Sequence, residues 1–246
     1  MNIDLFLSRS EIQQEKIKGR IAVVIDVLRA STSIITALKN GCQGIIPISE
    51  VEDAKELAKN FPSDSVLLGG ERNEMLVPGF DLSNSPLEYT LDRVNSKRII
   101  FTSTNGSRLF NDARQAEICS VGAFVNITRL SDYIIKTGLD LVVLCAGKLG
   151  SFGLEDVVCG GMIIEKIINE NSKPLHLNDG AIASRILYSY YANNIFDMLF
   201  QSSHGKRLIE IGQEKDLDIC SSVDSIPTIP VLQGDELISL ENSNFE

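Results

Sequence analysis

Tryptophan is absent from this chain of 246 residues, and histidine and cysteine are scarce. The two histidines, His176 and His204, do not stand in a metal-ligand spacing, so the sequence gives no sign of a zinc site. The five cysteines are odd in number, widely spaced and without a CxxC pair, which argues against a disulfide framework and favours reduced thiols. They are Cys42, Cys119, Cys145, Cys159 and Cys220.

Long hydrophobic runs and basic clusters are also missing. No segment approaches the roughly 20 apolar residues that a membrane span needs, and residues 1–10 lack the basic and apolar regions of an export signal. The formal net charge is -10 and no basic run offsets it, so we expect a cytoplasmic protein without membrane or nucleic-acid partners. A few arginines and N–H groups in one cleft would still let such a chain bind a small anion.

Short apolar runs rich in β-branched residues recur along the first 150 residues and predict buried strands. They are residues 21–27, 44–48, 66–68, 99–102, 118–121 and 141–145. Helical patterns separate them, including residues 127–136, which Gly138 follows as a predicted C-cap. This alternation predicts a layered α/β/α fold around a mainly parallel sheet.

Residues 20–73 and 98–150 share one order: strand, Ser/Thr-rich loop, helix, strand, helix, strand and Gly-containing loop. Either they arose by duplication or they share only a generic βαβ order. We expect a single α/β unit over residues 1–246, with two related βαβαβ halves packed together and a mostly helical C-terminal part over residues 154–246. Side-by-side packing of the halves would bring the carboxyl ends of their strands to one crevice, where open α/β sheets bind ligands.

The turn after the first buried strand combines an acid, an arginine and hydroxyls, namely Asp26, Arg29, Ser31 and Thr32. A helix N-terminus presents free N–H groups and the positive end of its dipole, so Arg29, Ser31 and Thr32 would hold a phosphate or carboxylate there. Asp26 would then reach a metal bound to that anion. The alternative is that Ser31 only caps the helix and Asp26 only ends the strand.

The matching turn of the second segment contains Asn105, Gly106 and Ser107 at the start of a helix. Asn-Gly alone is a common turn signal, but its position at the matching turn favours a second anion-binding loop. Two such loops facing one crevice suit a ligand with two acidic groups.

Two further loops offer charged groups. Arg72 would clamp an oxyanion while Glu71 or Asp81 contributes to a Mg²⁺ shell, and an ordinary surface loop is the alternative. The Gly-rich loop after residue 145 ends in Glu155 and Asp156, which would bind metal or only complement the helix dipole.

Known phosphatase and nucleotide-binding signatures do not match. The pattern DxDxT fails because Leu28 stands two residues after Asp26, and Cys-x5-Arg fails because Ser151 stands six residues after Cys145. A nucleotide P-loop would need glycine at Val142. The usual covalent and zinc routes are therefore not supported.

Five motifs, VVIDVLRASTSI, GGERN, PGFDLSNSP, TSTNGS and AGKLGSFGLEDVVCGG, together closely resemble the 2-phosphosulfolactate phosphatase family of Mg²⁺-dependent enzymes in coenzyme M biosynthesis. The resemblance runs from about residue 3 to past residue 179. It implies hydrolysis of (2R)-phospho-3-sulfolactate to 3-sulfolactate and phosphate. The chain departs from the family's pattern at Glu74 and Ser83, where glycine is commoner.

The resemblance and the residue chemistry together predict a site for a small phosphorylated, sulfonated acid. We expect catalytic roles for Asp26, Arg29 and Arg72. The residues expected to bind Mg²⁺ are Asp26, Asp81, Glu155 and Asp156. Those expected to bind substrate are Ser31, Thr32, Asn105, Gly106 and Ser107. The alternative is a non-catalytic sensor of a phosphorylated hydroxy acid, and whether the chain forms a homodimer stays open.

Overall fold

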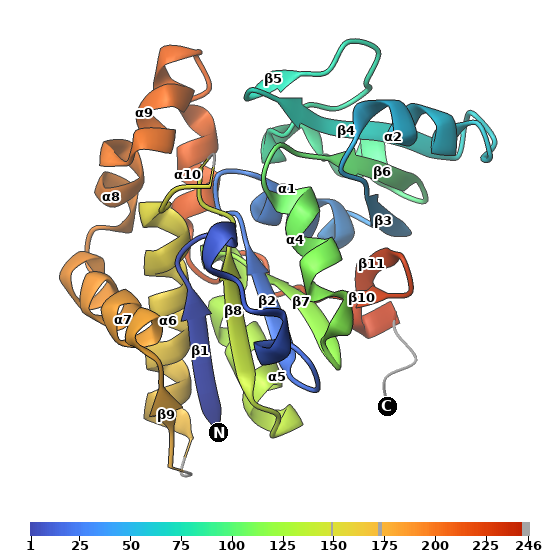
Figure 1. Cartoon of the computed structure of the whole chain (residues 1–246). Helices are drawn as coiled ribbons and strands as arrows, with labels where there is room; N and C mark the ends of the chain where they lie inside the picture. Colours follow the sequence, from blue (N-terminus) through green and yellow to red (C-terminus); the bar gives the residue numbers. More distant parts are fainter. Residues whose placement is uncertain (149, 172–173, 243–246) are drawn as a thin grey trace.

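The computed structural model describes residues 1–148, 150–171 and 174–242, so residue 149 of the second expected repeat and residues 172–173 and 243–246 of the expected C-terminal part lie outside it. In the described chain one eleven-stranded sheet carries helices on its faces (Figure 1). The strands are β1 (Asn2–Phe6), β2 (Ile21–Ile25), β3 (Gly44–Pro47), β4 (Val66–Arg72), β5 (Met75–Leu76), β6 (Arg98–Thr102), β7 (Ile118–Gly122), β8 (Leu141–Cys145), β9 (His176–Leu177), β10 (Pro230–Gln233) and β11 (Glu236–Ser239). The helices are α1 (Ala30–Lys39), α2 (Val51–Ala58), α3 (Leu91–Val94), α4 (Gly106–Asp112), α5 (Ile127–Thr137), α6 (Leu154–Glu170), α7 (Asp179–Tyr191), α8 (Ile195–Gln201), α9 (Ser203–Glu210) and α10 (Lys215–Ser221).

The sheet consists of two parallel blocks joined by an antiparallel hairpin. Its strand order is β5-β4-β6-β3-β11-β10-β7-β2-β8-β1-β9. Strands β4, β6 and β3 pair in parallel, and so do β7, β2, β8, β1 and β9. Strands β10 and β11 pair antiparallel with each other and with the blocks on either side. The predicted α/β/α class with a mainly parallel sheet is therefore confirmed.

The strands of the two expected repeats interlock. Strand β2 lies between β7 and β8, and β6 lies between β3 and β4. Residues 20–73 and 98–150 thus each place their first strand in one block and their other two strands in the opposite block, instead of packing side by side as separate units. The interlocking brings the loops after β2 and β6 together, since a Cβ on Gly106 would lie 2.8 Å from Asp26 Oδ2. Duplication itself stays a prediction.

Strand β2 shows why the sheet is covered on both faces. All five of its residues are buried. Successive side chains of a strand point to opposite faces, and accordingly Ile21, Val23 and Ile25 belong to one apolar cluster while Ala22 and Val24 belong to another. Full burial of each Val or Ile side chain stabilises the fold by about 1.5–3 kcal/mol. A continuous apolar run is stable here only because both faces are packed.

Helix ends and the C-terminal part complete the fold. Helix α5 ends at Gly138, whose φ of 67° is the left-handed conformation of a glycine C-cap, as the sequence predicts. From residue 154 onward the described chain is mostly helical but also contributes β9, β10 and β11. No helix in the described ranges is both long and apolar enough to cross a membrane.

Candidate active site

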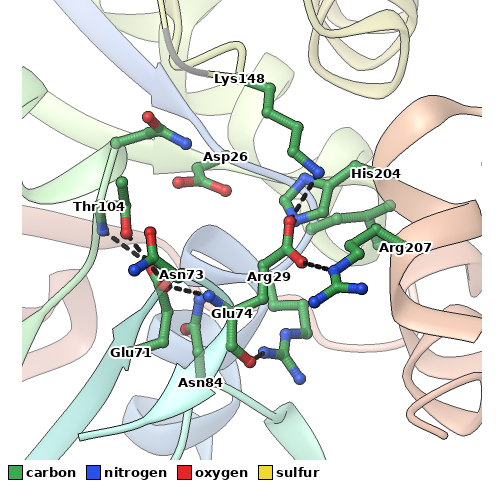
Figure 2. A pocket seen from close by; sticks show the side chains of 12 residues that line it. Asp26, Arg29, Glu71, Asn73, Glu74, Asn84, Thr104, Lys148, His204 and Arg207 are labelled. Carbon is green, nitrogen blue, oxygen red and sulfur yellow. Dashed lines mark hydrogen bonds and ion pairs between the residues drawn. The ribbon is translucent and has the colours of Figure 1, made fainter. Parts of the chain in front are cut away.

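A cavity of about 220 Å³ lies where the loops after β2, β6 and β8 meet hairpin β4–β5 and helix α9 (Figure 2). It is small beside the roughly 300–1,000 Å³ of pockets for drug-sized ligands, so it suits a small metabolite. Its lining combines acids and bases from segments far apart in the sequence. The charged or ionisable residues are Asp26, Glu71, Glu74, Arg29, Lys148, Arg207 and His204.

The first predicted anion loop is a tightly bonded turn after β2. The backbone N–H of Asp26 donates to Ser31 Oγ at 2.9 Å, and the N–H of Ser31 donates to the carbonyl of Asp26 at 2.8 Å. Thr32 Oγ1 donates to the carbonyl of Val27 at 3.0 Å. The structure thus uses the hydroxyls of Ser31 and Thr32 within the turn, and of these two residues neither lines the cavity.

The carboxyl group of Asp26 faces the cavity, and the residue as a whole is 7% exposed. Burial raises the pKa of Asp26 to about 6; His204 opposes this rise, whereas the negative charges of Glu71 and Glu155 add to it. A carboxyl group with this pKa exchanges a proton near neutral pH, which is the property expected of a functional acid.

The second predicted anion loop is built in a similar way. The N–H of Ser103 donates to Ser107 Oγ at 2.8 Å, and the N–H of Ser107 donates to Ser103 Oγ at 2.9 Å. Asn105 lines the cavity. A Cβ built on Gly106 would lie 2.8 Å from Asp26 Oδ2, so a side chain there would collide with this carboxylate. The structure therefore brings Asn105 and Gly106 to the site and leaves Ser107 as a support of the turn.

Glu71 joins hairpin β4–β5 to the loop after β6. Its Oε1 accepts the N–H of Thr104 at 2.6 Å. Its Oε2 accepts the N–H of Glu74 at 2.7 Å and the hydroxyl of Thr104 at 3.0 Å. Glu71 is 6% exposed, and both oxygens of its carboxylate hold the walls of the cavity in place.

Arg29 lines the cavity but its guanidinium is already paired. The side chain is 1% exposed and donates to Asp216 Oδ2 at 2.8 Å, to the side chain of Gln213 and to the carbonyl of Glu74 at 3.2 Å. The other oxygen of Asp216 accepts the hydroxyl of Ser85 at 2.6 Å. Arg29 thus ties α10 and hairpin β4–β5 to the loop after β2.

The other end of the cavity is cationic (Figure 2). Lys148 Nζ lies 2.6 Å from Glu74 Oε1, and Arg207 Nε donates to Glu74 Oε2 at 2.9 Å. His204 Nδ1 lies 3.3 Å from Glu155 Oε1, and its Nε2 lies 3.8 Å from Glu74 Oε1. Burial raises the pKa of Glu74, but the hydrogen bond from Lys148, with His204 and Arg207, outweighs burial and leaves the pKa lowered.

Asp156, predicted as a metal ligand, bridges two loops. Its Oδ1 accepts the N–H of Val27 at 2.9 Å and its Oδ2 accepts the N–H of Gly147 at 2.9 Å. Burial, followed by the charges of Glu155 and Asp26, raises the pKa of Asp156 well above its ordinary value. Because both oxygens are held by backbone donors, this geometry favours a role in positioning the loops after β2 and β8.

The structure does not bring Arg72 and Asp81 to the cavity. Glu71 faces the cavity, so its neighbour Arg72 points to the opposite face of the strand, where it donates to the carbonyl of Ser49 and to the hydroxyl of Thr102. Asp81 is exposed and accepts a backbone N–H of β4 at 2.9 Å. The sequence could not show which face of its strand Arg72 would occupy.

Sequence reasoning missed the roles of Lys148, His204, Arg207 and Asn84. Lys148 and Asn84 lie inside motifs that carry the family resemblance, so their positions were a usable signal. Asn84 is 4% exposed, lines the cavity, and its Oδ1 has no hydrogen-bond partner among the described residues. His204 and Arg207 lie on α9, outside any motif, and no sequence signal points to them.

The carboxylate of Asp26 has the chemistry of a ligand for a divalent cation. Among the described residues, no three His, Cys, Asp or Glu side chains form a metal-binding group, but Mg²⁺ commonly uses one or two carboxylates together with water and substrate phosphate. Within the described part, no side chain donates a hydrogen bond to the carboxylate of Asp26, which also experiences the repulsion of Glu71 and Glu155. The unpaired Oδ1 of Asn84 is another hard donor lining the same cavity.

The chain is similar in sequence to a family of known proteins. A family model described as 2-phosphosulpholactate phosphatase matches residues 6–235. The chain belongs to the 2-phosphosulfolactate phosphatase family. That family resemblance is therefore confirmed, and the protein is an enzyme of the phosphoric monoester hydrolase class.

Relatives in the 2-phosphosulfolactate phosphatase family cover nearly the whole chain. A probable 2-phosphosulfolactate phosphatase from Caldanaerobacter subterraneus subsp. tengcongensis is 41% identical over 234 residues, which are 95% of this chain and 96% of the relative. Proteins of the same name from Symbiobacterium thermophilum and Clostridium novyi are each 39% identical, over 92% and 94% of this chain and 97% and 96% of the relatives. The cavity therefore lies within the part of the chain that the family shares.

Proposed function

We propose that this chain hydrolyses (2R)-phospho-3-sulfolactate to 3-sulfolactate and phosphate with Mg²⁺, in coenzyme M biosynthesis. The observation that carries the proposal is a single small cavity in which a buried carboxyl group, Asp26, faces a cluster of cations. Lys148 and Arg207 offer positive charge to the acidic groups of such a ligand, and Arg29, whose guanidinium is paired with Asp216, supports the cavity wall beside them. The carboxyl group offers an oxygen ligand to the ion.

Asp26 would hold Mg²⁺, with Asn84 as a further oxygen donor from the cavity wall. When bound, the ion neutralises charge on the phosphoryl oxygens and helps to orient the substrate. Glycine at position 106 keeps the carboxylate of Asp26 in place, because a Cβ there would lie 2.8 Å from Asp26 Oδ2. Thr104 and Asn105 would orient the same end of the substrate from the loop after β6.

His204 is well placed to donate the proton that the leaving group needs. Its Nδ1 faces Glu155 and its Nε2 faces the cavity, so the carboxylate of Glu155 fixes the ring's orientation. As water forms a bond to phosphorus, the bond from phosphorus to the ester oxygen breaks and that oxygen takes a proton from Nε2. The proton that the water loses restores His204 through solvent. General acid catalysis of this kind contributes roughly 10²–10⁴-fold to a rate.

Phosphate release from (2R)-phospho-3-sulfolactate tests the proposal. We expect EDTA to abolish turnover and added Mg²⁺ to restore it, and we expect phospholactate, which lacks the sulfonate, to react with a higher KM. His204→Gln should lower kcat by roughly 10²–10⁴-fold. The matched control is His176→Gln, because this other histidine is exposed on β9 and should leave kcat unchanged.

Two results would overturn the proposal. If the wild-type chain with Mg²⁺ binds the substrate but releases no phosphate from it or from simple phosphomonoesters, the sensor interpretation holds. If EDTA-treated enzyme retains full turnover, the assignment of Mg²⁺ is wrong.

A further inference from the structure

The tip of hairpin β4–β5 inserts an acidic side chain into the cavity. Asn73 and Glu74 form the two-residue connection between the strands, and both have a positive φ, of 53° and 69°. Non-glycine residues rarely adopt this left-handed backbone conformation. Here it places the carboxylate of Glu74 among the cations of α9 and of the loop after β8 (Figure 2).

The carboxylate of Glu74 makes the contacts that an anionic ligand would make. One oxygen meets Lys148 at 2.6 Å and the other accepts from Arg207 at 2.9 Å, while His204 Nε2 lies 3.8 Å away. The side chain of Glu74 is 15% exposed, whereas those of Lys148 and Arg207 are 30% and 44% exposed, so the two cations can also be reached from solvent. Carboxylates and sulfonates both accept hydrogen bonds from Lys and Arg in this manner.

The backbone of Glu74 is held separately from its side chain. Its N–H donates to Glu71 Oε2 at 2.7 Å, and its carbonyl accepts from Arg29 at 3.2 Å. The carboxylate can therefore leave the cations by rotation about side-chain bonds, while the hairpin keeps its place.

We propose that the Glu74 carboxylate is an internal counterion that occupies the place of the substrate's non-reacting anionic group and is displaced when substrate binds. Lys148 and Arg207 are then the residues that select a ligand with a second acidic group. The identity of that group as sulfonate or carboxylate rests on the proposed function, but the displacement itself does not.

A competing internal anion has a definite effect on affinity. Any ligand group that binds Lys148 and Arg207 must first break their contacts with Glu74, so its apparent affinity is reduced by the stability of those contacts. Ligands with one anionic group gain too little to displace the carboxylate, whereas ligands with two gain from both ends of the cavity. Glu74 thereby increases discrimination while lowering affinity.

Calorimetric titration of the whole chain with inorganic sulfate and with 3-sulfolactate tests this inference. Glu74→Gln keeps the shape of the side chain but removes its charge, and Glu74→Gly suits the left-handed backbone. We expect both variants to bind sulfate at least about tenfold more tightly than wild type, with a similar fall in KM for the substrate. The matched control is Glu210→Gln, because Glu210 pairs with Arg207 at 3.1 Å from outside the cavity and is 64% exposed; it should leave the sulfate affinity unchanged.

A second substitution locates the effect. Adding Lys148→Met to Glu74→Gln should reverse the gain in sulfate affinity, because the freed cation is then gone. Unchanged or weaker sulfate binding by both Glu74 variants would overturn the inference, and so would a gain that survives Lys148→Met. Since sulfate binding needs no turnover, these results are independent of whether the proposed substrate is hydrolysed.

Discussion

Replacing Asp26 with asparagine should change both the pH dependence of stability and the Mg²⁺-dependent activity, because this carboxyl group is buried beside two other acids. The group's pKa rises from 3.8 to about 6 in the folded protein, first because of burial. A raised pKa means that the folded state binds the proton more tightly than the unfolded state. Its contribution to stability is therefore complete below about pH 3.8 and is lost as the pH rises through about 6.

The size of the effect follows from the shift. Each pKa unit corresponds to about 1.4 kcal/mol, so the ionisation of Asp26 should lower the free energy of unfolding by about 1.4 kcal/mol between about pH 5 and about pH 8. Asparagine does not ionise. Over this pH range, the free energy of unfolding of the metal-free Asp26→Asn variant should therefore fall by about 1.4 kcal/mol less than that of wild type. Its Mg²⁺-dependent kcat should fall by roughly 100-fold or more.

Urea denaturation of both proteins in EDTA, at the two pH values, measures the difference directly. Titrating groups that do not interact with Asp26 are common to both proteins and cancel in the comparison. If the free energy of unfolding of the two proteins changes with pH in the same way, burial does not shift the pKa of Asp26 in the folded protein. Full Mg²⁺-dependent turnover by Asp26→Asn would instead show that the group has no part in holding the ion.

Other substitutions test the remaining parts of the site. Asp156→Ala should destabilise the fold by roughly 1–3 kcal/mol for each of the two buried backbone N–H groups that it leaves unpaired, measured by urea denaturation. Arg72→Ala should change KM by less than about threefold but cost about 1–3 kcal/mol of stability, because it bonds a carbonyl and a hydroxyl outside the cavity; a large rise in KM would restore its predicted role as an anion clamp. Gly106→Ala should lower kcat by roughly 10–100-fold through displacement of the Asp26 carboxylate, with an unchanged circular dichroism spectrum as the check on folding.

The fold class was predictable because burial in a parallel sheet leaves a direct mark on the sequence. The apolar run that becomes β2 has no polar position, and only a strand covered on both faces tolerates that composition. The order of strands in the sheet was not predictable in the same way. That β2 lies between β7 and β8 depends on contacts between residues about 100 positions apart, such as Val23 with Ser120, and no local pattern encodes them.

The candidate site was predictable where it lies in loops that follow strands. Asp26, Arg29 and Asn105 line the cavity as the sequence suggests, because the carboxyl ends of β2 and β6 meet. Ser31 lies in the same motif, but its hydroxyl accepts a hydrogen bond from the N–H of Asp26 within the turn. A strand-to-helix loop needs internal hydrogen bonds as much as a ligand does, and the sequence does not distinguish the two uses of a serine.

Helices α9 and α10 supply charged side chains to the cavity and its wall. Arg207 comes from α9, and Asp216 of α10 holds Arg29 at the cavity wall. Removing one partner of a buried ion pair costs roughly 3–5 kcal/mol because the other charge stays buried and unpaired, so Arg29 keeps its position only with Asp216 of α10 beside it. The site is therefore complete only when the C-terminal helices are docked, although no sequence motif on them indicates this.

Charge balance in the cavity explains how an acidic chain can receive an acidic ligand. The formal net charge is -10, yet the described lining holds three cations and three carboxylates, the latter being Asp26, Glu71 and Glu74. Glu71 is held at both oxygens and Asp26 is set beside the expected ion, so Glu74 is the carboxylate most free to leave. Its departure would leave Lys148 and Arg207 without their shared counterion, and a bound anion would then take its place. The local field in a cavity with low-dielectric walls outweighs the distant, screened charges of the surface, so affinity for anions depends on this one side chain more than on the charge of the whole protein.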